Sequence, residues 1–407
     1  MKILLIHNFY QQFGGEDSVA LAERRLLEER GEDVLFWTRH NDEIKQYGIL
    51  EKANFFRETV YSQRTVRDIT SAVGNFKPDV AFIHNIYPLI SPSLFYTLHA
   101  LGVPMVQVFH DFRPYCSNGW FYVNGQVCER CKTGNHLHGV VNRCYRDSYL
   151  LSALYSATLG VNRRAGMLDK VDAFVCLTGF FKEKILEMGI PEEKIFIRPN
   201  FIDKLPAKVD ANGGSQPGSY GLYMGRLSNE KGLWTLIHAF EQLPGVELRI
   251  MGTGPLEKDI QTYLQAKKLA NITLVGFKSG EEKWNLIQRA RFGLVPSECY
   301  ENFPVVALEF FAASKPVIAS RMGGLPYIVE DGKSGLLFEP GNSTALAATI
   351  KELDSNPLAL ASLGRHGRFL AETKYGPQQG YDSLMQIFRT VLVHEPIFAA
   401  NLPAASD

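Results

Sequence analysis

The chain has 407 residues, with 43 lysines and arginines against 43 aspartates and glutamates, so its formal net charge is zero. This balance argues against a dedicated nucleic-acid binder, which usually carries a basic excess. With 45% hydrophobic and 21% charged residues, the composition excludes a disordered, coiled-coil or collagen-like chain. At about 150 residues per domain, the length predicts two to three domains.

The apolar stretches of the chain are too short for export or membrane insertion. The first one, at residues 3–6, is shorter than a signal-peptide core and is followed by no small-residue cleavage site. The longest one is interrupted by Ser152, Ser156 and Thr158, so it falls short of the roughly 18 residues that a membrane span needs. We therefore expect a cytoplasmic protein whose six cysteines are thiols or metal ligands rather than disulfides.

Short apolar runs typical of buried strands alternate with helical patterns in the first half of the chain. The predicted strands are at residues 3–7, 34–37, 80–84, 103–109 and 171–176. Helices are expected between them, as where apolar residues recur at helical spacing from Val19 to Leu27, and again at 150–167 and 180–188. Such alternation predicts a parallel sheet covered by helices on both faces.

The clearest linker is the stretch 205–219, which contains Asn212-Gly213-Gly214-Ser215-Gln216-Pro217-Gly218. After it the alternation starts again, with strands predicted at residues 221–224, 246–251, 272–275, 292–295 and 316–319. We therefore expect an α/β protein of two doubly wound parallel-sheet domains, residues 1–204 and 220–380. The linker would serve as a hinge, and a final segment, 381–407, would follow.

The strongest motif is Glu301-Asn302-Phe303-Pro304-Val305-Val306-Ala307-Leu308-Glu309, just after a predicted strand. Pro304 suits the first position of a helix, whose free N–H groups and dipole can face a phosphate. Glu309 would then lie more than one turn inside this helix, able to accept hydrogen bonds from a ribose. Glu301 would lie in the loop, able to contact a sugar hydroxyl. The alternative is a pair of surface glutamates beside an ordinary core helix.

Two basic residues follow the first predicted strand of the second half. Arg226 lies in Gly225-Arg226-Leu227, and Lys231 precedes Gly232 at the start of the next helix. At the carboxyl end of a strand, such cations are placed to hold a diphosphate. The sequence contains no Asp-x-Asp, so a nucleotide site built on a chelated metal of that kind is not expected.

With these motifs the chain resembles the retaining glycosyltransferases of family 4. In the second half the resemblance rests on Gly225-Arg226-Leu227, Lys231-Gly232, the Glu301 and Glu309 pair, and Gly335-Leu336-Leu337-Phe338. In the first half it rests on Gly14-Gly15, Pro78-Asp79-Val80, His84-Asn85, His110-Asp111 and Pro199-Asn200. It covers nearly the whole chain. Asn302 departs from the family, which most often has glycine or another small residue there; asparagine tolerates left-handed backbone angles better than most residues.

The resemblance implies the GT-B fold, in which two Rossmann-like domains face a cleft, and a UDP- or GDP-sugar donor handled without a catalytic metal. It also implies that residues 1–204 are the acceptor-side domain, that residues 220–380 bind the nucleotide sugar, and that a last helix at residues 381–393 crosses back to the first domain, followed by a tail. Arg226 and Lys231 would neutralise the donor diphosphate as it leaves. Glu309 would bind the ribose, and Glu301 and His110 the donor sugar. The remaining donor contacts would come from Gly14, Gly15, Asn302, Phe303, Pro304 and Val305.

The family also implies the acceptor and the pathway. The acceptor would be a saccharide or a lipid-linked saccharide, in the synthesis of a surface polysaccharide, with no nucleic-acid partner. Two other functions stay open at this point. One is a sugar-nucleotide epimerase of the same fold, and the other is a non-catalytic sugar-nucleotide-binding scaffold.

Residues 113–147 interrupt the alternation and contain four cysteines, Cys116, Cys128, Cys131 and Cys144. A Cys-x2-Cys pair chelates one metal from a tight turn, and two more thiolates complete a tetrahedral zinc site. His136 and His138 could replace one of them, and an iron–sulfur cluster would lack its usual spacing. The sequence therefore predicts an insertion with a structural zinc, the alternative being four unrelated thiols.

The same part of the chain is basic. From residue 113 to 170, eight lysines and arginines stand against three acidic residues in an otherwise neutral protein. Such an excess would attract an anionic membrane surface or a lipid diphosphate. The other interpretation is a solvated face with arginines packed over a helix.

Overall fold

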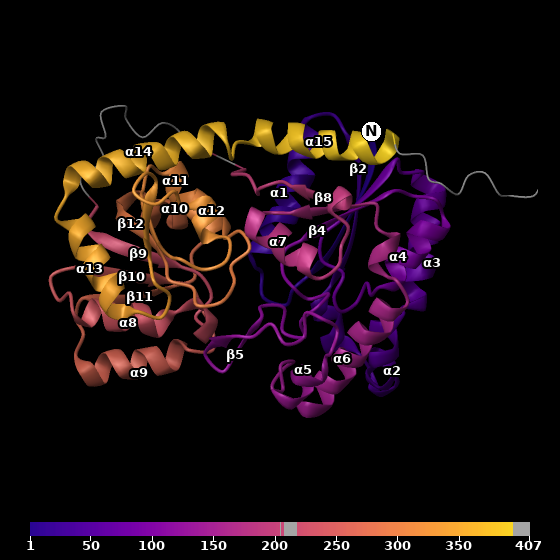
Figure 1. Cartoon of the computed structure of the whole chain (residues 1–407), viewed down its shortest axis with the longest axis horizontal. Helices are drawn as coiled ribbons and strands as arrows, with labels where there is room; N and C mark the ends of the chain where they lie inside the picture. Colours follow the sequence, from indigo (N-terminus) through magenta and orange to yellow (C-terminus); the bar gives the residue numbers. More distant parts are fainter. Residues whose placement is uncertain (204, 207–217, 394–407) are drawn as a thin grey trace, which may run out of the picture.

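The computed structural model describes residues 1–203, 205–206 and 218–393. Two six-stranded parallel sheets build two lobes that lie side by side, and a two-stranded hairpin belongs to the cysteine-containing insertion (Figure 1). Most of the linker predicted at 205–219, namely residues 207–217, lies outside the described residues, as does the predicted tail from residue 394 onwards.

The first lobe has the strand order β2-β1-β3-β4-β7-β8. Its strands are β1 (Lys2–Phe9), β2 (Asp33–His40), β3 (Val80–Ile83), β4 (Met105–Phe109), β7 (Ala173–Cys176) and β8 (Ile195–Ile197). Its main helices are α1 (Gly15–Glu29), α2 (Ile49–Val60), α3 (Gln63–Phe76), α4 (Ser93–Ala100), α6 (Tyr149–Arg164) and α7 (Gly179–Glu187). Ile3, Leu4 and Leu5 are fully buried, since helices cover both faces of the sheet.

The second lobe repeats this arrangement, with the order β11-β10-β9-β12-β13-β14. Its strands are β9 (Tyr220–Met224), β10 (Glu247–Met251), β11 (Ile272–Gly276), β12 (Ala290–Val295), β13 (Val317–Ser320) and β14 (Gly335–Phe338). Its helices are α8 (Leu233–Glu241), α9 (Glu257–Lys267), α10 (Gly280–Arg289), α11 (Val305–Ala312), α12 (Leu325–Ile328), α13 (Ser343–Asp354) and α14 (Pro357–Thr373). The strand order reverses at β1 and at β9, and ligands of such sheets bind beyond the carboxyl ends of the strands at these points.

The last helix, α15 (Pro377–Val393), returns to the first lobe and runs along it (Figure 1). The ring of Phe388 lies 5.4 Å from that of Phe82 on β3. The buried Arg198 donates from Nη2 to the carbonyl of Gly380 at 2.8 Å, and Tyr381 donates to Glu32 at 2.5 Å. This last described helix therefore packs against the same sheet that contains β1.

The insertion follows β4, where the sequence placed it, and contains β5 (Tyr122–Val123), β6 (Gln126–Val127) and α5 (Leu137–Val141). It reaches the second lobe at three points. The Trp120 ring lies 5.9 Å from the Arg226 guanidinium, Tyr122 donates to Glu298 at 3.2 Å, and Tyr300 donates to Glu129 at 2.9 Å. The insertion thus bridges the two lobes, and β5 lies between them in Figure 1.

Candidate active site

The loop between β12 and α11 carries the predicted donor motif. The helix begins at Val305, and Pro304 precedes it in an extended conformation with ψ near 110°. The prediction that Pro304 takes the first helical position is therefore wrong by one residue. Its carbonyl accepts the N–H of Ala307 at 3.1 Å, so Pro304 caps the helix, and the amides at its very start have no partner within the helix.

Glu301 and Lys231 form an ion pair in this loop. Lys231 Nζ lies 2.6 Å from Glu301 Oε1, and Ser297 donates to the same oxygen at 2.5 Å. Burial opposes the lysine's charge, but the charge and hydrogen bond of Glu301, together with the nearby Cys299 and Tyr223, outweigh burial and raise the pKa of Lys231 above its usual value. Lys231 is therefore a fixed cation at the carboxyl edge of the second sheet.

Glu309 has a lysine partner of its own. It lies inside α11, as predicted, and its Oε1 is 2.6 Å from Nζ of Lys283 on α10. Both side chains are partly exposed, so the carboxylate can exchange this contact for a ligand hydroxyl. Arg226 is also exposed, beside Trp120 of the insertion, and Tyr223 donates to the carbonyl of Arg226 at 2.8 Å.

Asn302, the departure from the family pattern, joins the two lobes. Its amide donates to the carbonyl of Phe109 at 2.6 Å, directly before His110. Asn302 is not among the described residues that have a positive φ. A left-handed backbone, expected from the sequence, therefore does not explain why asparagine occupies this position. The side chain is needed for its hydrogen bond, and that bond brings the Glu301 loop against the end of β4.

His110 is held by a second histidine. Its Nε2 lies 2.8 Å from Nδ1 of the buried His84, and the two rings stack with centroids 5.0 Å apart. Burial, together with the nearby His7, lowers the pKa of His110 to about 3, and burial lowers that of His84 well below its usual value. Both rings are therefore neutral near pH 7, which suits a hydrogen-bonding role more than a charged one.

The predicted glycine loop of the first lobe begins α1. The N–H of Gly14 donates to Asp17 at 2.8 Å, and Asp17 in turn lies 2.8 Å from the buried His7. The amide of Gly14 is thus already bound, which leaves Gly15 and the start of α1 to approach a phosphate. A cavity of about 30 Å³ nearby is lined in part by Glu16, His110 and Arg113.

Family models match both lobes. The model "Glycosyltransferase Family 4" matches residues 13–204, and the model "Glycosyl transferases group 1" matches residues 211–368. Between them they span most of the chain. The chain belongs to the family 4 glycosyltransferases.

Two relatives illustrate how far the similarity reaches. An uncharacterised glycosyltransferase of Methanocaldococcus jannaschii is 34% identical over 197 residues, which are 48% of this chain and 54% of that one. The amylovoran biosynthesis glycosyltransferase AmsK of Erwinia amylovora is 28% identical over 221 residues, 52% of this chain and 54% of that one. The chain thus spans about half the length of these curated relatives.

Solved structures confirm the predicted GT-B fold. HepE of Anabaena, in complex with UDP and glucose, superposes with a TM-score of 0.66 at 16% identity, covering 96% of this chain and 100% of that one. The sucrose-phosphate synthase of Thermosynechococcus elongatus gives a TM-score of 0.70 at 20% identity, covering 96% and 99%. In the part of the chain that is described, no helix combines the length and the apolar character that a bilayer span requires.

The four cysteines of the insertion lie near one another as free thiols. Cys144 interacts electrostatically with each of Cys116, Cys128 and Cys131. Burial raises the pKa of Cys131 to about 11 and that of Cys144 to about 12. No three histidine, cysteine or acidic side chains of the described residues are arranged as metal ligands, so zinc binding would require these thiols to move together.

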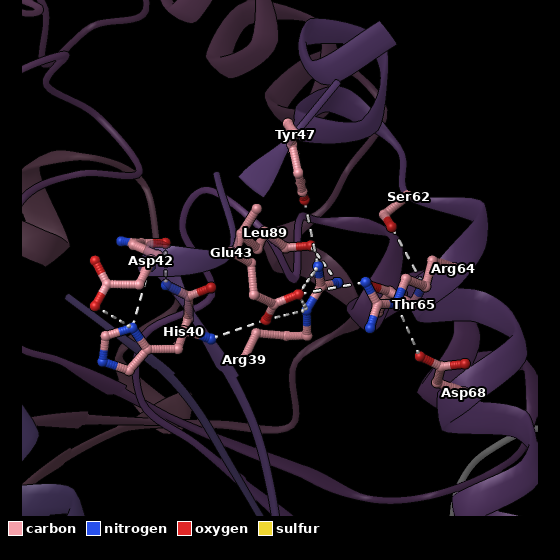
Figure 2. A network of polar contacts seen from close by, with 12 residues as sticks. Arg39, His40, Asp42, Glu43, Tyr47, Ser62, Arg64, Thr65, Asp68 and Leu89 are labelled. Atoms are coloured by element: carbon pink, nitrogen blue, oxygen red, sulfur yellow. Dashed lines mark hydrogen bonds and ion pairs between the residues drawn. The ribbon is translucent and has the colours of Figure 1, made fainter. Parts of the chain in front are cut away.

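A pocket of about 240 Å³ opens where β2, α2 and α3 meet. Arg39, at the end of β2, binds Glu43 with Nη2 to Oε2 at 2.8 Å and donates to the carbonyl of Leu89 at 3.5 Å (Figure 2). Arg64 reaches the same carboxylate oxygen of Glu43 at 3.3 Å. Charged and hydroxyl-bearing side chains, among them Tyr47, Arg64 and Arg67, line this pocket.

Sequence reasoning missed three residues that position the site. Lys283 pairs with Glu309, Trp120 lies beside Arg226, and Ser297 binds Glu301. Ser297 precedes the motif by only four residues and could have been included. Trp120 and Lys283 lie far away in sequence, so no local pattern indicates them.

Proposed function

We propose that the protein is a retaining glycosyltransferase that moves a sugar from a nucleotide-sugar donor to a saccharide or lipid-linked saccharide in surface-polysaccharide synthesis. The observation that carries the proposal is the convergence of Lys231, Glu301 and the start of α11 beside the β4 end that presents His110. The UDP and glucose bound to HepE support the donor class. Relatives named for amylovoran and colanic acid biosynthesis support the pathway.

In the proposed reaction, the bond between the sugar C1 and the diphosphate oxygen breaks, and the acceptor oxygen bonds to C1 on the same face. The acceptor's proton passes to the departing phosphate. Arg226, Lys231 and the amides at the start of α11 stabilise the negative charge that grows on the diphosphate. Fixed cations take the place of a divalent metal in this proposal.

The remaining roles follow the positions of the side chains. Glu309 would exchange Lys283 for the ribose hydroxyls, and Glu301 and the neutral His110 would bind hydroxyls of the donor sugar. Gly15 would approach the phosphates from the first lobe. We also propose the division into domains at 1–204 and 220–380 with a hinge at 205–219; the cytoplasmic location stays a prediction.

Turnover with and without acceptor separates this function from its rivals. A transferase releases nucleoside diphosphate in proportion to glycosylated acceptor. An epimerase converts the sugar nucleotide without any acceptor, and a scaffold binds it without turnover. We expect release of nucleoside diphosphate that depends on a saccharide or lipid-linked saccharide acceptor. Conversion of the sugar nucleotide in the absence of acceptor would favour the epimerase.

Glu309→Ala and Glu301→Ala are expected to affect different parts of the donor. Glu309→Ala should weaken binding of bare UDP or GDP, because ribose contacts are the same in the ground and transition states. Glu301→Ala should leave the affinity for the bare nucleotide almost unchanged and weaken only the binding of the sugar nucleotide. Calorimetry with both ligands measures this, and an equal loss of bare nucleotide in the two variants would contradict the division of roles.

We propose a structural zinc on Cys116, Cys128, Cys131 and Cys144. The proposal is supported by the Cys-x2-Cys spacing and by the mutual proximity of the thiols. Zinc would have to deprotonate these thiols, and binding would then contribute to the folding of the insertion.

Cys128→Ser is expected to remove the metal and to lower transferase activity while sparing binding of the nucleotide. The purified protein should carry about one zinc per chain by elemental analysis. Cys176→Ala is the matched control, since Cys176 is a buried free thiol in β7. Finding neither zinc nor iron in fresh protein, with four titrating thiols in the insertion, would reject the site.

A further inference from the structure

The solvent-facing side of α6 is apolar. Leu150 is 68% exposed, and Ala157 and Val161 are also exposed. Spacings of seven and four residues place these three side chains on one face of a helix. The opposite face packs into the first lobe through Tyr155 and Leu159. A helix that is apolar on both faces is normally buried, so this exposed face calls for a partner.

The short helix α5 extends this apolar face. Leu137 and Val141 lie one turn apart on α5 and are 70% and 69% exposed. The helix packs against α6, and Tyr149 at the start of α6 is exposed as well. Figure 1 shows α5 and α6 at the edge of the first lobe opposite α15. We name Leu137, Val141, Tyr149, Leu150 and Val161 the α5–α6 surface.

The charges on α5, on α6 and in the segment between them are almost all positive. Residues 134–164 contain four arginines and one aspartate, and no lysine or glutamate. Arg143 lies 5.6 Å from the ring of Tyr149, and Arg146 and Arg164 are exposed. The single aspartate, Asp147, pairs with Arg143 at 3.3 Å. Apolar side chains with an aromatic residue and arginines around them are typical of helices that lie in a membrane interface.

We infer that the α5–α6 surface docks the protein on an anionic lipid bilayer. Leu137, Val141 and Leu150 would enter the headgroup region, and Arg143 and Arg146 would contact lipid phosphates. A bilayer is favoured over a protein partner because the arginines flank the apolar side chains, as anionic headgroups around acyl chains require. This surface gives a location to the membrane contact that the excess of basic residues predicts. The inference rests on the proposed function only for its biological purpose.

Docking here would connect the bilayer to the predicted donor site through one segment of the chain. The insertion that carries α5 contacts the second lobe at its other end, through Trp120 beside Arg226 and Tyr122 on Glu298. One continuous segment thus joins the docking surface to the neighbours of Arg226 and Glu298 on the second lobe. A lipid-linked acceptor would then reach the site without leaving the membrane.

Sedimentation with lipid vesicles tests this inference. The intact protein should bind vesicles of phosphatidylcholine with phosphatidylglycerol more strongly than phosphatidylcholine alone, and added salt should weaken the binding. Arg143→Gln with Arg146→Gln should lower the partition coefficient by roughly fivefold for each arginine. Leu137→Glu with Leu150→Glu should lower it by about tenfold or more, since it removes inserted apolar groups.

The matched control is Leu358→Glu with Arg365→Gln on α14. Leu358 is 84% exposed and Arg365 is exposed, and both belong to α14. Figure 1 shows α14 on the other lobe, far from α5 and α6. This control should bind vesicles like the unmodified protein. Melting temperature and UDP binding should be unchanged in every variant, which would show that the lobes remain folded.

Three results would overturn the inference: no binding of the unmodified protein to anionic vesicles, variants that bind as well as it does, or competition by inorganic phosphate at low concentration. A dimer in sedimentation velocity that Leu137→Glu with Leu150→Glu dissociates would assign the surface to a second copy instead. Vesicle binding through this surface without sugar-nucleotide turnover would contradict the proposed function and leave the docking surface standing.

Discussion

Lys231→Met is expected to lower kcat by about 100-fold while the fold stays intact. Methionine keeps most of the side-chain volume and removes the charge that would stabilise the departing diphosphate. The effect should fall on kcat more than on donor affinity, because the negative charge at the leaving oxygen grows only in the transition state. The unpaired carboxylate of Glu301, 2.6 Å from the lost ammonium, would add repulsion toward the diphosphate.

Lys278→Met provides the control for this substitution. Lys278 also pairs with a glutamate, Glu282, at 3.5 Å in the same lobe, but that glutamate is largely exposed and belongs to no predicted donor contact. Initial rates at saturating donor should be unchanged in the control. Arg226→Ala should lower kcat by as much as Lys231→Met does. Near-normal turnover in both variants would reject the assignment of these cations to the diphosphate.

The sheets could be predicted because buried parallel strands read as continuous apolar runs. Residues 3–7 and 221–224 are such runs, and the structure has β1 and β9 there. The strand β8 is only three residues long, and the hairpin strands β5 and β6 have two each, so their local pattern is too short to detect. The start of α11 was missed by one residue because Pro304 suits both the cap and the first turn.

The candidate site was predictable as a set of charged residues but not as a set of pairs. Lys231 and Glu301 are 70 positions apart in the chain, and their 2.6 Å contact exists only because β9 and β12 are neighbours in the sheet. The same holds for Asn302, whose partner is a backbone carbonyl of the other lobe. Tertiary contacts of this kind leave no local pattern.

The insertion shows a similar limit. Its cysteines and its excess of basic residues are visible in the sequence. The helix predicted at 150–167 exists as α6. The sequence does not show that the insertion bridges the two lobes. It also does not show that the apolar residues of α6 divide between a buried and an exposed face, because this depends on which side of the helix meets the first sheet. The spacing of Leu150, Ala157 and Val161 alone is equally consistent with a core stripe.

Phe388→Ala is expected to destabilise the first lobe by about 3–5 kcal/mol. Phe388 is fully buried on α15 and contacts Phe82 of β3 edge-on, so the truncation leaves a cavity against the first sheet. The loss of stability should lie in the first lobe, although Phe388 belongs to the helix that follows the second lobe in the chain. Arg198, donating to Gly380, and Tyr381, donating to Glu32, hold the start of the helix on the same lobe.

Thermal unfolding and hydrogen exchange together measure this effect. Amides of β1 and β3 should exchange faster in Phe388→Ala, while those of β9 and β12 and the binding of UDP by the second lobe should change little. Val393→Ala, 77% exposed on the same helix, should shift stability by less than about 0.5 kcal/mol. An unchanged melting temperature, or equal loss of protection in both sheets, would mean that α15 does not stabilise the first lobe.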